Sequence, residues 1–250
     1  MKFSGKTAIV TGSSSGIGRG VALAFAVEGA AVVVNFPTVA QAADANAVVT
    51  AIQQGGGRAI AVQADVSSEA DCTRLIGECE AHFGPADTLV NNAGIANVAL
   101  VHEMPVAQWD QMFAVHVRDT FLMTRGVLPG MLARGHGRII STASQLAYKG
   151  AAGFAHYTAA KGAIISFTRS VALELADSGV TINCVAPGAT RTPILADVPA
   201  ARMEEIRRAI PLGRLAEVDD VVPSYVFLAS EEGRHYQGQC ISPNGGDVFL

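Results

Sequence analysis

A tyrosine and a lysine four residues apart have the types and spacing of an acid–base pair. Tyr157 and Lys161 lie in a stretch whose pattern predicts a helix, so both side chains share one face. A fixed ammonium beside a phenol favours the phenolate and lowers the tyrosine pKa from about 10. The pair therefore predicts a proton donor and acceptor for neutral pH, although the spacing alone also fits a buried tyrosine and a surface lysine.

Length and composition indicate one large α/β domain. The chain has 250 residues, of which 50% are hydrophobic and 16% charged, and this suits a single sizeable core. A net charge of -4 gives no basic footprint for nucleic acid and no polybasic membrane patch. The apolar run at residues 7–11 leaves no room for a signal peptide, and no run is as long as a membrane span. We expect a soluble, cytoplasmic protein.

The cysteines and histidines predict no metal site. Cys72, Cys79, Cys184 and Cys240 form no C-x-x-C pair, and the six histidines show no metal-ligand spacing. We interpret Cys72 and Cys79 as small buried residues of one helix.

Short β-branched runs alternate with longer helical patterns, as is typical of a parallel sheet with helices on both faces. Seven strands are expected, at residues 7–11, 31–35, 59–63, 88–91, 138–141, 181–185 and 239–242. Helices are expected at residues 17–28, 40–54, 69–82, 106–134, 218–229 and from the Tyr157 region to 176, with a bend near Pro129. Residues 1–250 are predicted to form a single domain in which residues 190–214 are a mobile substrate lid.

A glycine-rich turn after the first strand predicts a nucleotide site. Gly12, Gly16 and Gly18 allow the backbone to approach a pyrophosphate at a helix N-terminus. Their spacing, G-x-x-x-G-x-G, also fits an ordinary turn, but the position in an alternating α/β chain favours the nucleotide.

Two further strand ends suit the same ligand. Asp65, before Val66, can bond an adenine amino group or cap a helix. Asn91, Ala93 and Gly94 leave space beside a cofactor, and amides there can tie strand ends together, although a plain Asn-Gly turn is the alternative.

The end of the second strand bears on the choice between NAD and NADP. An acid there bonds the adenosine ribose and repels a 2′-phosphate, but this chain has Asn35 and Phe36. The glycine-rich turn carries Ser14 and Ser15 and no Arg or Lys to hold that phosphate; Arg19 is a candidate, but an arginine that faces outward or pairs elsewhere is the favoured interpretation. We expect NADP(H), with NAD(H) as the alternative.

Together these residues resemble the classical short-chain dehydrogenase/reductase family, over nearly the whole chain. The pattern is closest to 3-oxoacyl thioester reductases and related carbonyl reductases. The resemblance implies a Rossmann-type three-layer fold, a seven-stranded parallel sheet of order 3-2-1-4-5-6-7, and a homotetramer. The matching motifs are Thr11-Gly12, Gly16-Ile17-Gly18, Asn91 to Gly94, Ser144 with Tyr157 and Lys161, and Pro187-Gly188 with Thr192.

The resemblance also implies roles. Tyr157 matches the catalytic acid/base, Lys161 the residue that lowers its pKa and holds the nicotinamide ribose, and Ser144 the hydroxyl that bonds the substrate oxygen. The residues implied to contact the cofactor are Gly12, Ser14, Ser15, Gly16, Ile17, Gly18, Asn35, Phe36, Asp65, Val66, Asn91, Ala93, Gly94, Tyr157, Lys161, Pro187, Gly188, Thr190 and Thr192.

One departure from the family pattern lies in the long helix after the fourth strand. The family has an asparagine in N-x-x-G-x-F where this chain has His116, and Asp119 replaces the glycine. Histidine donates, accepts and carries protons, so we expect His116 to keep the proton relay attributed to the asparagine, as a further catalytic residue. A histidine that only packs the helix is the alternative.

The expected substrate pocket is mainly apolar and is lined by Ser144, Leu146, Phe154, Ile194 and Leu195. A basic patch for an acidic carrier protein is conceivable from Arg125, Arg134, Arg202, Arg207 and Arg208. The turn at residues 177–179 has no arginine, however, where carrier-protein reductases of the family often carry one.

We therefore predict an enzyme, an NAD(P)-dependent oxidoreductase that interconverts a secondary alcohol and a ketone, and most closely a 3-oxoacyl-type or small carbonyl reductase. The alternatives are an NAD-dependent polyol or hydroxy-acid dehydrogenase and a non-catalytic dinucleotide-binding regulator. The regulator is disfavoured because Ser144, Tyr157 and Lys161 are all present. The expected partner is a small-molecule substrate, without nucleic acid or membrane.

Overall fold

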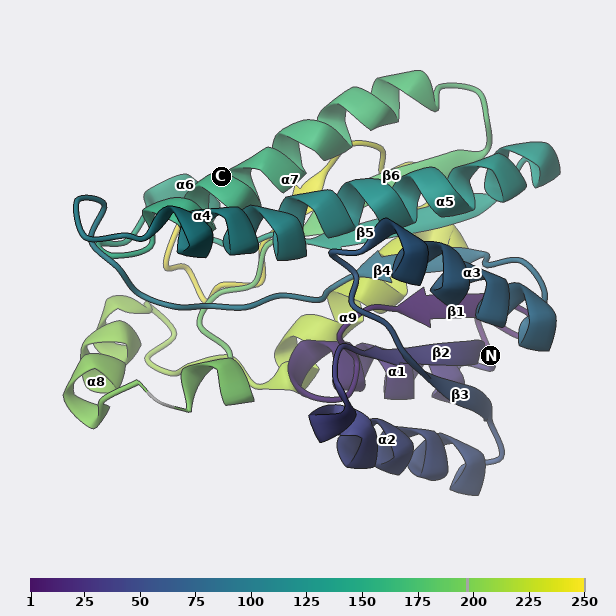
Figure 1. Ribbon diagram of the computed structural model, residues 1–250, viewed down its shortest axis with the longest axis horizontal. Coiled ribbons are helices and arrows are strands. Elements are labelled where there is room, and N and C mark those ends of the chain that lie inside the picture. Colours follow the sequence, from purple (N-terminus) through teal and green to yellow (C-terminus); the bar gives the residue numbers. More distant parts are fainter. Residues whose placement is uncertain (197, 250) are drawn as a thin grey trace.

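A single parallel sheet forms the centre of the computed structural model, which describes residues 1–196 and 198–249. Within these residues seven strands pair in the order β3-β2-β1-β4-β5-β6-β7, which confirms the predicted topology (Figure 1). The strands are β1 (Thr7–Val10), β2 (Ala31–Phe36), β3 (Arg58–Gln63), β4 (Thr88–Asn91), β5 (Gly137–Thr142), β6 (Val180–Val185) and β7 (Cys240–Ile241).

Helices cover both faces of the sheet (Figure 1). One face packs against α1 (Gly16–Val27), α2 (Ala42–Gln54) and α9 (Val218–Ala229). The other face carries α3 (Glu69–Phe83), α4 (Val106–Phe113), α5 (Asp119–Arg134) and α7 (Ala155–Glu174). The short α6 (Leu146–Lys149) and α8 (Ala200–Ala209) complete the α-helices of the described residues.

The central strands β1, β2, β4 and β5 are buried along their whole length because both of their faces are covered. In β2, Val32 and Val34 point into the cluster beneath α1, whereas Val33 points into the cluster beneath α3 and α5. All three side chains are fully buried. This alternation, with no polar face, is what a parallel sheet between two helical layers requires.

The long helical region after β4 is interrupted at a different place from the one expected. Pro129 lies inside α5 without ending it, and it is solvent-exposed, so water can serve the carbonyl that proline leaves unbonded. The irregular segment is instead a π-helical turn at Ala114–Arg118, between α4 and α5. Such turns occur often at functional sites, and this one carries His116.

The segment expected to form a lid holds a 3-10 turn, η3 (Pro193–Leu195), and α8, which stands apart from the sheet (Figure 1). None of the helices described is long and apolar enough to cross a membrane. The described residues contain no cluster of three or more metal-ligating side chains.

Candidate active site

The glycine-rich turn packs tightly against the end of β4. Gly12 has φ +59°, and an ideal Cβ on it would lie 2.7 Å from the Cα of Ala93, so a side chain does not fit. Gly16 has φ +57° and begins α1. The N-terminus of α1 has no side-chain cap at Ser15 and no acidic residue in its first turn. It therefore presents backbone N–H groups suited to an anion.

Hydrogen bonds tie the ends of β1, β4 and β5 together, as expected for the amides. Thr11 Oγ1 accepts from the backbone N–H groups of Asn92 and Ala93, both at 2.9 Å. Asn92 Nδ2 donates to the carbonyl of Thr11 at 3.0 Å. Asn91 is buried, and its Nδ2 donates to Ser141 Oγ at 3.2 Å, so its side chain faces β5.

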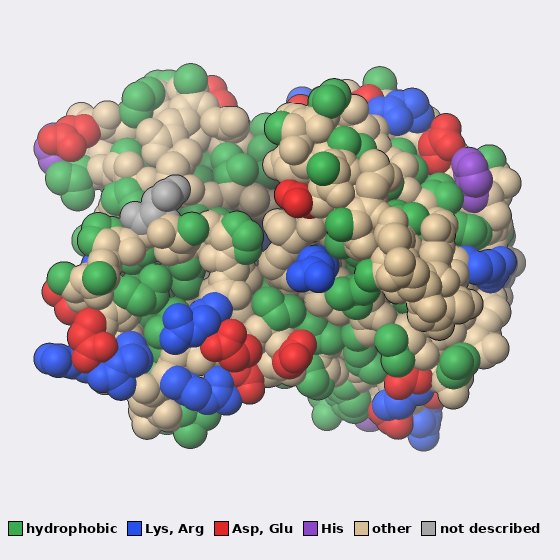
Figure 2. Space-filling model, turned by 90° about the horizontal axis from the view of Figure 1, so that it is seen from below, with side chains coloured by type: hydrophobic (Ala, Val, Ile, Leu, Met, Phe, Trp, Pro, Cys, Tyr) green, Lys and Arg blue, Asp and Glu red, His purple; other side chains and the backbone are tan. Residues whose placement is uncertain are grey.

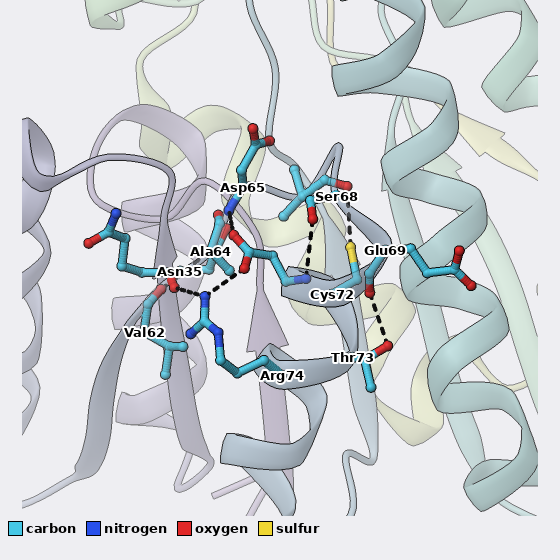
Figure 3. Close-up of polar contacts among 12 residues, drawn as sticks. Asn35, Val62, Ala64, Asp65, Ser68, Glu69, Cys72, Thr73 and Arg74 are labelled. Atoms are coloured by element: carbon cyan, nitrogen blue, oxygen red, sulfur yellow. Dashed lines mark hydrogen bonds and ion pairs between the residues drawn. The ribbon is translucent and has the colours of Figure 1, made fainter.

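Asn35 supports the glycine-rich turn from the end of β2. It is 1% exposed, its Oδ1 accepts from Gly12 N at 3.0 Å, and its Nδ2 donates to the carbonyl of Ala64 at 3.0 Å. Figure 3 shows Asn35 beside Ala64 and Val62. These bonds occupy the Asn35 side chain, which therefore supports the shape of the glycine-rich turn.

Asp65 lies at the carboxyl end of β3 and is exposed (Figure 3). Its Oδ1 accepts from the backbone N–H of Ser67 at 2.9 Å and from its hydroxyl at 2.7 Å. Ser68 caps α3. The structure thus gives Asp65 a turn-stabilising role and leaves it on the surface, while Val66 beside it is buried.

Tyr157 and Lys161 emerge from one face of α7, and Ser144 follows β5. Ser144 Oγ accepts from the backbone N–H of Leu146 at 3.1 Å, and its hydroxyl lies near the Tyr157 phenol, whose pKa it lowers. Lys161 is 3% exposed, its Nζ donates to the carbonyl of Thr142 at 2.6 Å, and it lies 5.7 Å from the centroid of the Tyr157 ring. The three predicted catalytic groups therefore converge.

The pKa of Tyr157 differs from the expectation. Burial raises it above 10, and the hydrogen bond from Ser144 opposes that rise. The predicted lowering by Lys161 is not found, because the ammonium binds the carbonyl of Thr142 and lies over the ring rather than beside the phenol oxygen. Burial lowers the pKa of Lys161 itself to about 8.

His116 is buried against the ring of Tyr157. Its Nε2 lies 2.9 Å from the carbonyl oxygen of Ile95 and 3.2 Å from the Ile95 nitrogen, whereas Nδ1 has no partner among the described residues. Burial, and then the charge of Lys161, hold the pKa of His116 well below 6.5, so the ring is neutral at neutral pH. An ideal Cβ on Gly94 would lie 2.6 Å from His116 Cε1, so Gly94 makes room for the imidazole.

Asp119 is a candidate that the sequence indicated only as a departure from the family pattern. It is 1% exposed, and Thr11 Oγ1 lies 3.5 Å from its Oδ2. Its Oδ1 has no partner within the described part of the chain. Burial raises the pKa of Asp119 well above 3.8, against the charge of Lys161. The one signal in the sequence that pointed to Asp119 was a carboxyl side chain at the position where the family has a glycine.

The segment after β6 lies between the glycine-rich turn and the loop after β5 that carries Ser144. The carbonyl of Pro187 accepts from the backbone N–H of Gln145 at 3.1 Å, and Thr190 Oγ1 donates to the carbonyl of Gly188 at 3.0 Å. An ideal Cβ on Gly16 would lie 3.4 Å from the Thr192 side chain, so the start of the lid borders the glycine-rich turn.

The expected substrate residues divide into two groups. The ring of Phe154 lies 6.0 Å from that of Tyr157, and Leu146 begins α6 directly after the Ser144 loop. Ile194 and Leu195 lie in η3 instead, where Ile194 is 48% exposed.

A polar network beside Tyr157 was missed by sequence reasoning. His156 is fully buried, and its Nε2 lies 2.6 Å from Asn97 Oδ1. Gln108 Nε2 donates to the same oxygen at 2.8 Å. No spacing could have indicated it, because the three residues come from α7, the loop after β4, and α4.

Known proteins are similar to this chain in sequence and in fold. Residues 6–203 match the family described as short chain dehydrogenase. The chain is 40% identical over 246 residues to a 3-oxoacyl-[acyl-carrier-protein] reductase of Synechocystis sp., with 98% of each chain covered. It is 35% identical, also over 98% of each chain, to a (2S)-[(R)-hydroxy(phenyl)methyl]succinyl-CoA dehydrogenase subunit of Thauera aromatica. The crystal structure of a dehydrogenase/reductase from Sinorhizobium meliloti 1021 superposes with a TM-score of 0.91, at 35% identity, covering 98% of this chain and 96% of that one.

The chain belongs to the short-chain dehydrogenase/reductase family. It is an NAD(P)-dependent oxidoreductase that acts on alcohol and carbonyl groups.

Proposed function

We propose that the chain is an NADP(H)-dependent reductase of 3-oxoacyl thioesters carried on coenzyme A or of related small ketones. The observation that carries this proposal is the Ser144 hydroxyl facing the Tyr157 phenol, whose ionised form it favours, with Lys161 buried beside the same ring. Two donors aimed at one point stabilise charge that develops on a carbonyl oxygen.

We assign the steps to the chain's own residues. Ser144 bonds the substrate oxygen, and Tyr157 gives it a proton as the carbonyl becomes an alcohol. The raised pKa of Tyr157 keeps the phenol protonated at neutral pH, which suits it as the acid in reduction. Bound nicotinamide supplies the hydride. Lys161, released from the carbonyl of Thr142, would turn to the nicotinamide ribose.

The residues present fit a dinucleotide. The uncapped N-terminus of α1, without acids in its first turn, suits a pyrophosphate. The end of β2 favours NADP(H), because its last residue is Phe36 and no carboxylate there would repel a 2′-phosphate. The exposed carboxylate of Asp65 would accept a hydrogen bond from the adenine amino group.

We propose His116 as a neutral relay. Its Nε2 contacts Ile95, so Nδ1 is the atom left to accept a hydrogen bond on the path that returns a proton to Tyr157. The T-shaped contact between the two rings supports this role.

The charge pattern of the lid argues against a carrier protein. In α8, Arg202 pairs with Glu205, and both Arg207 and Arg208 pair with Glu204. Red and blue side chains accordingly lie side by side at this end of the molecule (Figure 2). Arg125 pairs with Glu69 as well. Each of these four arginines is ion-paired within the chain, with Glu204 shared by two of them, and this favours a substrate that needs no acidic protein partner.

We further propose that residues 190–214 close over the substrate as a lid and that the chain, one domain throughout, works as a homotetramer in the cytoplasm. The exposed Ile194 of η3 supports the lid, because closure would bury it. Light scattering of the purified protein tests the tetramer.

A matrix of cofactors and substrates tests the function. NADPH and NADH are each combined with acetoacetyl-CoA, the same acyl group on a carrier protein, and simple ketones, using wild type and Tyr157→Phe. The proposal expects the highest kcat/KM with NADPH and the coenzyme A ester, and no comparable rate in the variant. A preference for NADH with polyols or hydroxy acids would favour the alternative dehydrogenase.

A further inference from the structure

Two cysteines stand opposite each other at the edge of the sheet. Cys184 of β6 and Cys240 of β7 are direct partners in the parallel register of these strands. Neighbouring strands lie about 4.8 Å apart, within the roughly 4.4–6.8 Å that disulfides span between Cα atoms. Among the described strands β7 has β6 as its one neighbour and is two residues long, so it can shift to bring two sulfurs together.

The two thiols differ in their surroundings. Cys184 is fully buried, and its Sγ donates to Thr168 Oγ1 at 3.1 Å. Cys240 is half-buried and packs in one cluster with Cys184 and Tyr148. The cation of Arg169 lies nearby.

These contacts make Cys240 the reactive member of the pair. The neighbouring Cys184 side chain lowers the pKa of Cys240 below 9.0 in spite of burial, and the hydroxyl of Tyr148 and the charge of Arg169 add to this effect. The thiolate is the form that attacks peroxides and disulfides. Cys184, by contrast, has a raised pKa and stays a thiol beside it.

The other two cysteines lack this arrangement. Burial raises the pKa of both Cys72 and Cys79 to about 12. Their sulfurs donate to backbone carbonyls, of Val66 at 3.2 Å and of Gly84 at 3.6 Å. They provide an internal comparison for reactivity.

We propose that Cys240 and Cys184 form a peroxide-responsive dithiol, in which Cys240 is the attacking and Cys184 the resolving residue. The Cys240 thiolate attacks a peroxide oxygen, the O–O bond breaks, and sulfenic acid and water (or an alcohol) form with uptake of one proton. The Cys184 thiol then attacks that sulfur, loses its proton, and displaces a second water as the disulfide forms. Two thiols are oxidised and one peroxide is reduced.

The disulfide would reach the catalytic loop through α6. Tyr148 lies in α6, which begins two residues after Ser144, and the Ser144 hydroxyl accepts from the first backbone N–H of that helix. Oxidation would move the Cys240 sulfur away from Tyr148, so α6 would lose the contact with β7 that this side chain makes. We expect the oxidised enzyme to lose activity several-fold and to recover it with dithiothreitol.

Peptide mapping of the wild-type protein tests the proposal without any variant. Native protein is treated with hydrogen peroxide, unfolded in an alkylating agent, digested and analysed by mass spectrometry. The expected result is a disulfide-linked pair of peptides holding Cys184 and Cys240, with Cys72 and Cys79 alkylated. A Cys184 that stays alkylated while Cys240 is unmodified or carries sulfinic acid would overturn the proposal.

Matched variants test the effect on activity. In Cys240→Ser the hydroxyl can still accept from Tyr148, so basal activity is expected to stay near wild type while the response to peroxide disappears. Cys79→Ala removes a thiol from α3 and should keep the full response. Equal loss of activity in wild type and Cys240→Ser after peroxide would refute the link to the catalytic loop.

Discussion

The ring of His116 stands edge-on to the ring of Tyr157, with centroids 5.5 Å apart and planes at 87°. The π-helical turn at Ala114–Arg118 places the imidazole there, and its contact with Ile95 fixes the ring. Nδ1 of His116, which has no partner within the described part of the chain, is therefore held in place next to the ring of Tyr157. A residue that departs from the family pattern thus lies in contact with the central residue of the site.

His116→Ala is expected to lower kcat by up to about 10²-fold, the low end of what a positioned proton-transfer group contributes. His116→Asn, which keeps a side-chain donor and acceptor, is expected to retain most of the activity. The wild-type pH–rate profile should show no step near pH 6.5 from His116, because its pKa is held well below that value. If the profiles of both variants superimpose on wild type, His116 has no relay role.

Gly94→Ala is expected to destabilise the fold by about 1–3 kcal/mol, as an overpacked core does. The added Cβ would lie 2.6 Å from His116 Cε1. Urea unfolding in wild-type and His116→Ala backgrounds measures the coupling, and most of the cost should vanish when the imidazole is absent.

Gly77→Ala is the control for that experiment, because it lies in α3 with nothing within 4 Å of its ideal Cβ. It should be neutral or stabilising by up to about 1 kcal/mol, the usual gain of alanine over glycine in a helix. An equal cost of Gly94→Ala in both backgrounds would show that the imidazole is not what the methyl group meets.

Local patterns and the resemblance to the family together predicted the fold. The helix expected at residues 218–229 is α9 with the same bounds, and the predicted strand order is the observed one. The helix and the parallel sheet follow from short-range signals, namely apolar runs buried on two faces and alternation that requires parallel crossovers, whereas the strand order was implied by the resemblance. Local propensity did not report the π-helical turn at Ala114–Arg118, which interrupts the long helical region, whereas Pro129 lies inside α5 without ending it.

The site was predictable where motifs carry it and unpredictable where tertiary contacts do. Ser144, Tyr157 and Lys161 converge as expected, but the bond from Lys161 to the carbonyl of Thr142 depends on how α7 packs on β5. The dithiol pair likewise depends on strand register, since Cys184 and Cys240 are far apart in sequence. Such contacts have no sequence period and emerge only from the assembled sheet.

Tyr157→Phe is expected to lower kcat by about 10²–10⁴-fold, the range for loss of a general acid. Phenylalanine keeps the ring contacts with His116 and Phe154, so cofactor affinity and unfolding should change little. Stopped-flow reduction and NADPH fluorescence titration measure the two quantities separately. A variant that keeps more than a tenth of wild-type kcat would exclude Tyr157 as the proton donor.

Lys161 should make stability depend on pH in the alkaline range. Burial lowers its folded-state pKa to about 8, whereas the unfolded side chain titrates near 10.4. Between these values the unfolded chain binds more protons, so the free energy of unfolding rises with pH. Relative to Lys161→Met, wild type should gain on the order of 3 kcal/mol between about pH 7 and pH 10.5. Parallel pH dependence in the two proteins would show that the buried ammonium carries no such penalty.

Asp119 should act in the opposite direction. Burial raises its folded-state pKa well above 3.8, so the folded chain binds more protons than the unfolded one above about pH 4. Below the unfolded-state pKa of Asp119 the wild type is at its most stable with respect to this group. Its free energy of unfolding then falls as the pH rises through the folded-state pKa of Asp119. The Asp119→Asn variant should not show this fall. Urea unfolding from about pH 4 to pH 8 should show the free energy of unfolding of Asp119→Asn rising relative to wild type by about 1 kcal/mol or more, the equivalent of a pKa shift of one unit.

Asp110→Asn, which removes an exposed carboxylate of α4, controls for the removed charge. An Asp119→Asn variant that follows wild type at every pH would mean that the buried carboxyl stays ionised, stabilised by Lys161 through the core.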